Sequence, residues 1–191
     1  PSTLIGFSAG GGFVLRFAGG ENQSLFSSYL LLSPFITQDA PNYRSESNKW
    51  VQVGLPRTIA ISILDSLGIH TFNHLPIIRF AINEEARPHL TPEYDFNLAM
   101  NFRASTNFKN NIRDVKSPCS VIAGADDELF DTSTLEPLFN SQGKSWPTVI
   151  LPNIGHIGLT LDSSAHAAIE QEVRKLHAHK KRPHALSDST E

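Results

Sequence analysis

A serine flanked by glycines two positions to either side is the first candidate for chemistry in this chain. Residues 6–10 read Gly-Phe-Ser-Ala-Gly, with Ser8 at the centre. An apolar pair at 4–5 precedes this run and an apolar stretch at 13–15 follows it. The pattern predicts a strand, a sharp turn and a helix, with the serine hydroxyl held at the tip of a strained turn. Ser8 is therefore a candidate nucleophile.

A serine hydroxyl needs a base within hydrogen-bond reach, and that base is usually a histidine. Among the eight histidines, His156 follows an expected strand at 148–151, and Gly155 and Gly158 beside it leave room for a loop at the sheet edge. Lone loop histidines are commonly solvated, but this one lies after the last expected strand, where such a base is required. We therefore predict that His156 is the base.

The histidine should be oriented by a carboxylate from the end of the preceding strand. An expected strand at 119–124 is followed directly by Asp126, Asp127 and Glu128. The Gly-x-x-Asp spacing from residue 124 favours Asp127 as the orienting acid, while Asp126 remains an alternative that would more naturally tie down the turn. Glu128 is expected to cap a helix near residue 133.

Strands and helices alternate around these residues. Buried strands are expected at 2–7, 28–33, 119–124 and 148–151, and helices at 9–18, 133–141 and 162–178. A Ser133-x-x-Glu136 capping box should open the second of these helices, and Asp162 or Ser163 should cap the third. This alternation predicts an α/β fold with a mostly parallel sheet flanked by helices.

Residues 35–116 break the alternation and are expected to form a helical cap inserted into a core made of 1–34 and 117–178. One cap helix is expected at 58–67, where Ile59, Ile63, Leu64 and Leu67 have helical spacing. Another should begin at Thr91-Pro92, with threonine as N-cap, and continue through Phe102. The tail at 179–191 has little to bury and is expected to be flexible.

The order Ser8, Asp127, His156 resembles the α/β-hydrolase superfamily of serine esterases, in particular its monoglyceride-lipase or lysophospholipase-like branch. The similarity rests on residues 6–10, on Gly124-x-x-Asp127 and on Pro152-x-x-Gly155-His156, and it extends over about residues 2–178. It implies an esterase with a Ser-His-Asp triad, and the backbone N–H of Ala9 as one oxyanion donor. The motifs do not specify a substrate, so thioesters, amides and other reactions on the same fold remain open.

The resemblance also implies strands and a second oxyanion loop upstream of the elbow, which this chain lacks. Losing one oxyanion donor typically costs about 2.7 to 4 kcal/mol of transition-state stabilisation. An alternative function is therefore a catalytically incompetent hydrolase fragment, or a hydrolase-like protein that binds a ligand or partner. The strand at 2–7 would then be open to self-association or to a complementing N-terminal segment.

Composition argues against several kinds of partner, location and cofactor. With 16 basic and 19 acidic residues and no basic stripe, nucleic acid is not an expected partner. No apolar run approaches the roughly 18 residues of a membrane helix, and the single cysteine cannot form an internal disulfide, so we expect a cytoplasmic location. No cofactor or metal is expected, because His70, His74 and His89 lack the close spacing and acidic partners of a metal site. Aromatic residues of the cap are more commonly core than pocket, and none is assigned to the site.

Overall fold

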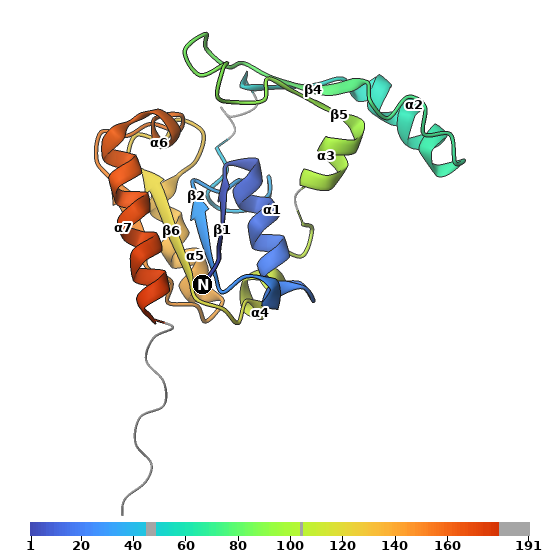
Figure 1. The fold of residues 1–191 in the computed structure, drawn as a ribbon. Coiled ribbons are helices and arrows are strands. Elements are labelled where there is room, and N and C mark those ends of the chain that lie inside the picture. The colour runs from blue at the N-terminus through green and yellow to red at the C-terminus, as the bar shows by residue number, and fades with distance from the viewer. Residues whose placement is uncertain (45–48, 104, 180–191) are drawn as a thin grey trace, which may run out of the picture.

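The computed structural model describes residues 1–44, 49–103 and 105–179 of the 191-residue chain (Figure 1). Its main sheet has four parallel strands in the order β1-β2-β6-β7. These strands are β1 (Thr3–Phe7), β2 (Ser28–Leu32), β6 (Cys119–Gly124) and β7 (Thr148–Leu151). The predicted α/β class with a parallel sheet is confirmed.

Helices cover both faces of this sheet (Figure 1). Tyr29 and Leu31 of β2 pack against α1 (Ala9–Ala18), α4 (Phe108–Asp114) and α5 (Leu135–Ser141). Leu30 and Leu32 face the opposite side, against α6 (Gly158–Leu161) and α7 (Ser163–His179). A strand buried on both faces needs a continuous apolar run, which explains why β2 contains no charged residue.

The segment that the sequence assigned to a helical cap also contains a second sheet. Three antiparallel strands are ordered β3-β4-β5, namely β3 (Val51–Val53), β4 (Pro76–Phe80) and β5 (Glu93–Asp95). They are accompanied by α2 (Leu55–Ser66) and α3 (Phe96–Phe102). The description of 35–116 as a helical cap therefore omitted this sheet, whereas the proposed division of the chain into domains remains a prediction.

The helix expected from Thr91-Pro92 begins later than predicted. Residues 93–95 pair with β4 instead, and α3 begins at Phe96. Asp95 is its N-cap, and the carboxylate accepts a 2.7 Å hydrogen bond from the N–H of Leu98. Strand pairing thus overrides the Thr-Pro signal, and the aspartate immediately after the strand provides the cap that the helix needs.

The Ser133 capping box is not formed. A short 3-10 helix, η3 (Thr132–Thr134), precedes α5, and the Ser133 hydroxyl donates to Asp131 at 2.6 Å. The same carboxylate accepts the N–H of Ser133 at 3.2 Å, so Asp131 caps the 3-10 turn. At the start of α7, Asp162 accepts the N–H of Ser164 at 2.7 Å, which selects Asp162 over Ser163 as the capping side chain.

The exposed face of α2 is unusually apolar. Ile59, Ile63 and Leu67 are 53%, 56% and 69% exposed, while Ile61 is only 3% exposed and packs in the cap cluster. The stripe that predicted this helix is therefore not the face that it buries. Within the ranges given above, no helix is both long and apolar enough to cross a bilayer. Most of the predicted tail, 180–191, lies outside the described residues.

Candidate active site

Ser8 lies in the sharp turn between β1 and α1. Its backbone has φ 51° and ψ −118°, a conformation that residues other than glycine rarely adopt. The turn is held by hydrogen bonds from the Ser8 N–H to the carbonyl of Leu32 at 2.9 Å and from the Phe35 N–H to the Ser8 carbonyl at 2.9 Å. Strain of this kind persists only where the surroundings fix it, and it gathers at functional sites.

The first glycine of the motif lets strand and helix meet. A Cβ on Gly6 would lie 2.3 Å from the carbonyl oxygen of Gly10 and 2.6 Å from Cγ2 of Val14. No side chain could occupy that space without moving the start of α1. Gly6 therefore fixes the position from which the Ser8 hydroxyl projects.

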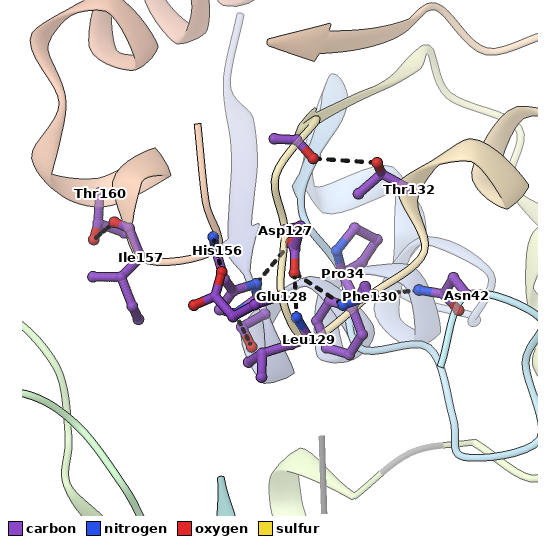
Figure 2. A network of polar contacts seen from close by, with 12 residues as sticks. Pro34, Asn42, Asp127, Glu128, Leu129, Phe130, Thr132, His156, Ile157 and Thr160 are labelled. Atoms are coloured by element: carbon purple, nitrogen blue, oxygen red, sulfur yellow. Dashed lines mark hydrogen bonds and ion pairs between the residues drawn. The ribbon is translucent and has the colours of Figure 1, made fainter. Parts of the chain in front are cut away.

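The hydroxyl of Ser8, the ring of His156 and the carboxylate of Asp127 form one hydrogen-bonded chain. Nε2 of His156 lies 3.0 Å from Oγ of Ser8, and Nδ1 of the same ring lies 2.9 Å from Oδ2 of Asp127. Figure 2 shows the carboxylate of Asp127 between this ring and the backbone of residues 129–130. His156 and Asp127 are each only 2% exposed. The structure thus brings together the three residues that the sequence singled out, 119 and 29 positions apart along the chain.

Asp127 is held as a carboxylate. Burial by itself would raise its pKa, since a buried charge loses hydration, but the hydrogen bond and charge of His156 and the N–H of Phe130 outweigh burial and hold the pKa of Asp127 below its usual value. Its Oδ1 accepts hydrogen bonds of 2.9 Å from the N–H groups of both Leu129 and Phe130. Asp127 therefore remains ionised near neutral pH. It can orient the ring of His156 and stabilise the positive charge of the ring when the ring is protonated.

The loop that carries His156 is held by the loop after β6. A Cβ on Gly124 would lie 2.0 Å from the carbonyl oxygen of Ile154, which accepts the N–H of Asp126 at 3.1 Å. Glu128 accepts the N–H of His156 at 2.9 Å through Oε2. The prediction that Glu128 caps the helix near 133 is thus wrong, because its carboxylate turns toward the histidine loop (Figure 2).

Aromatic rings on either side restrict the imidazole of His156. Phe7 lies 4.8 Å away between ring centroids, and Phe130 lies 5.1 Å away in an edge-on arrangement. Phe7 is inside the serine motif, so its role could have been suspected from the sequence, whereas nothing in the sequence signalled Phe130.

Asp126, the alternative acid, is exposed. None of the contacts among the described residues joins its side chain to His156.

Two cavities reach Ser8. The larger, of about 420 Å³, lies between the sheet edge and the cap, and most of its lining is aromatic or aliphatic. The smaller, of about 250 Å³, is lined by Ser8, His156 and Ile157 and on the cap side by His89 and Thr91. Tyr94 and Phe102 line both, whereas Phe96 and Phe108 are buried in the core. Sequence reasoning therefore missed His89, Tyr94 and Phe102 as cavity residues.

Ala9 is next to Ser8 and is the candidate oxyanion donor. It is the first residue of α1 and lines both cavities. The first N–H groups of a helix have no partner within the helix, so the N–H of Ala9 remains a candidate donor to a bound oxyanion. In the part of the chain that the structure covers, no cluster of His, Cys, Asp or Glu could hold a metal ion.

Three solved structures are among those with a similar fold. A candidate aryl esterase from Burkholderia cenocepacia has a TM-score of 0.62 at 11% identity, over 92% of this chain and 65% of that one. A monoacylglycerol lipase from Paleococcus ferrophilus has 0.55 at 17%, over 93% and 68%. A candidate non-heme bromoperoxidase, BpoC from Mycobacterium tuberculosis H37Rv, has 0.56 at 15%, over 95% and 68%. No protein-family model and no curated protein matches the sequence.

These similarities establish the fold. The parallel four-stranded sheet with its flanking helices matches α/β-hydrolase structures over most of the chain. The chain spans about two thirds of the length of those structures. At identities of 11–17% the likeness concerns the fold, so the chemistry has to be argued from the site itself.

Proposed function

We propose that the protein is a serine hydrolase that cleaves carboxylic esters through an acyl-enzyme intermediate. The observation that carries this proposal is the continuous chain Ser8 Oγ, His156 and Asp127, with contacts of 3.0 and 2.9 Å, in which Ser8 lines a largely apolar cavity. A hydroxyl, an imidazole and a buried carboxylate in this order constitute the machinery of nucleophilic acyl transfer. The α/β-hydrolase fold of the chain supports the same chemistry.

In the first half-reaction, Oγ of Ser8 attacks the ester carbonyl carbon while Nε2 of His156 takes the hydroxyl proton. The carbonyl oxygen becomes an oxyanion, and the N–H of Ala9 donates a hydrogen bond to it. The C–O bond to the alcohol then breaks, and His156 returns its proton to the departing oxygen. The products of this step are the acylated serine and a free alcohol.

In the second half-reaction, water replaces the alcohol. His156 deprotonates the water as it attacks the acyl carbon, and the protonated ring then returns the proton to Oγ of Ser8. Asp127 stabilises the imidazolium in both steps and holds the ring in the tautomer that has its proton on Nδ1. The net reaction consumes one ester and one water and yields an acid and an alcohol.

The lining of the larger cavity favours an apolar acyl group. Trp50, Phe80, Phe102 and Phe130 surround the space that leads to Ser8, and such a lining binds hydrocarbon by excluding water. We place the activity in the monoglyceride-lipase or lysophospholipase-like branch. The monoacylglycerol lipase among the structural neighbours supports that placement.

Active-site labelling tests the proposal. A fluorophosphonate probe should label the wild-type chain, and Ser8→Ala should abolish labelling and the hydrolysis of a p-nitrophenyl ester. Ser62→Ala is the matched control, because the Ser62 hydroxyl is exposed on α2 and donates only within its own helix, to the carbonyl of Thr58. Labelling that persists in Ser8→Ala, or that fails in a folded wild-type chain, would contradict the proposal.

One observation favours binding without turnover as a second candidate. In the described sheet β1 pairs only with β2, so the strand that leads into Ser8 has an unpaired edge. An unpaired edge offers backbone N–H and C=O groups that can pair with another chain. A folded chain that binds an apolar ester, measured by calorimetry, yet releases no alcohol would favour this candidate.

A further inference from the structure

The base His156 lines only one of the two cavities. This difference decides which cavity holds the alcohol part of a bound ester and which holds the acyl part. Ser8 and Ala9 line both, but His156 lines only the smaller one. In the mechanism proposed above, on which this inference rests, His156 must deliver its proton to the oxygen of the departing alcohol. The alcohol therefore leaves on the side of the smaller cavity, and the acyl group lies in the larger one.

Of the described residues that line the larger cavity, one has a charged side chain, namely Arg103. Arg103 follows directly after the last residue of α3, and its side chain is exposed. No carboxylate in the described part of the chain forms an ion pair with it, although Arg79, Arg87 and Arg174 each have one. Among the described residues, Arg103 is thus a positive charge without a counter-charge beside a cavity whose other lining side chains are uncharged.

A second arginine, Arg16, adds positive charge near Arg103 and holds the backbone at the end of α3. The guanidinium of Arg16 donates to the backbone carbonyls of Asn101 and Arg103, the latter at 3.0 Å. These bonds tie the end of α3 to α1, the helix that begins beside Ser8. Burial, followed by repulsion from the charge of Arg103, lowers the pKa of Arg16.

We propose that the larger cavity binds an acyl chain whose far end carries a carboxylate, and that Arg103 recognises this carboxylate. The substrate class is then the monoester of a dicarboxylic acid, with its hydrocarbon segment along the aromatic lining and its ester carbonyl at Ser8. A guanidinium forms paired hydrogen bonds with a carboxylate, which a lysine at the same position could not reproduce. The anion also relieves the repulsion between Arg103 and Arg16.

Two esters that differ only at the far end of the acyl chain test the proposal. Monomethyl suberate ends in a carboxylate where methyl octanoate ends in a methyl group, and the rest of the two molecules is identical. The ratio of kcat/KM for the first over the second measures recognition of the anion. Arg103→Gln should lower this ratio by about 3- to 30-fold, the range between an exposed ion pair and a charged hydrogen bond. Added salt should lower the wild-type ratio as well.

Arg79→Gln is the matched control. Arg79 is an exposed arginine of the same cap, paired with Glu93 at 3.2 Å, and it lines neither cavity. Its replacement should leave the ratio as in the wild type. An unchanged ratio in Arg103→Gln, or an equal loss in Arg103→Gln and Arg79→Gln, would overturn the proposal.

A third ester tests the direction. Carboxymethyl octanoate carries its carboxylate on the alcohol, and its turnover relative to methyl octanoate should not depend on Arg103. Dependence on Arg103 for this ester and not for monomethyl suberate would overturn the assignment of the acyl side.

The outcome is separable from that of the proposed function. Turnover of methyl octanoate and probe labelling at Ser8, with no effect of Arg103 on the ratio, would refute the anion site alone. If no ester is turned over, binding of monomethyl suberate to the Ser8→Ala variant can still be measured by calorimetry. Adding Arg103→Gln to that variant should weaken binding by about 3- to 30-fold, and unchanged binding would refute the anion site.

Discussion

Glu128 and His156 are joined by a hydrogen bond of 2.9 Å from the backbone N–H of the histidine to Oε2 of the glutamate. The neighbouring Asp127 accepts a hydrogen bond from the ring of the same histidine at 2.9 Å. Two consecutive acids thus hold the backbone and the side chain of one residue. Asp127 is buried and Glu128 is exposed, so the two contacts differ in how strongly water competes with them.

We expect Glu128 to act as a positioning residue for His156. Glu128→Ala removes the acceptor and should lower kcat by about tenfold, which corresponds to about 1.4 kcal/mol for a charge-assisted hydrogen bond. Glu128→Gln keeps an amide oxygen as acceptor and should recover part of that loss. Steady-state kinetics of both variants on one ester provide the measurement, and equal activity in the two would contradict a positioning role.

Asp127 and Asp126 should differ sharply in their effect on activity. Asp127→Asn leaves the shape of the side chain but loses the charge that fixes the tautomer of His156, and it should lower kcat by about 10⁴-fold. Asp126→Asn changes an exposed side chain without contact to the ring and should alter kcat by less than about twofold. Parallel kinetics on the two variants, with circular dichroism to verify folding, decide between them. A large loss in Asp126→Asn would reverse the assignment.

The lowered pKa of Asp127 makes stability dependent on pH in a defined direction. The carboxylate is favoured in the folded state, so its contribution is complete above the unfolded pKa of about 3.9 and is lost as pH falls through the lower folded value. Urea unfolding of the wild type should therefore show a steeper loss of free energy below about pH 4 than unfolding of Asp127→Asn. Parallel pH profiles for the two proteins would show that Asp127 contributes no such dependence.

The two glycines of the serine motif should respond differently to alanine. Gly6→Ala drives a Cβ to 2.3 Å from the carbonyl of Gly10 and should destabilise the fold by about 3 kcal/mol. Gly10→Ala meets only Cε1 of Phe102, at an ordinary 3.8 Å, and by helix propensity should be neutral or stabilising by up to about 1 kcal/mol. Thermal or urea unfolding of both variants gives the comparison. Similar losses in the two would show that close strand-helix contact does not explain the motif.

Two isoleucines lie on different faces of α2, Ile61 on the buried face and Ile59 on the exposed face, and their replacement by alanine should have different effects on stability. Ile61→Ala removes a side chain that is 3% exposed and should cost about 2 to 4 kcal/mol in the free energy of unfolding. Ile59→Ala changes a side chain that is 53% exposed and should cost less than about 0.5 kcal/mol. Urea unfolding followed by fluorescence measures both. The reverse order would mean that α2 packs with its other face inward.

The sequence by itself determined the local features of the site. Glycines around Ser8 permit the sharp turn between a strand and a helix. The apolar runs at β2 and β6 require burial in a sheet that is covered on both faces. Because the carboxyl ends of parallel strands meet at one edge, residues that follow those strands can be expected to converge there. This is why the sequence alone predicts that Ser8, Asp127 and His156 lie together.

Only the tertiary structure decided how neighbouring side chains divide their roles. Asp126, Asp127 and Glu128 carry the same chemical group in consecutive positions, and which one contacts the ring of His156 depends on the path of a loop 29 residues away. Likewise, pairing with β4 set the beginning of α3, and packing selected Ile61 over the stripe that includes Ile59. The position of Arg103 beside the larger cavity depends on Arg16, 87 residues earlier in the chain. Contacts at such separations depend on the whole fold, and local sequence patterns do not encode them.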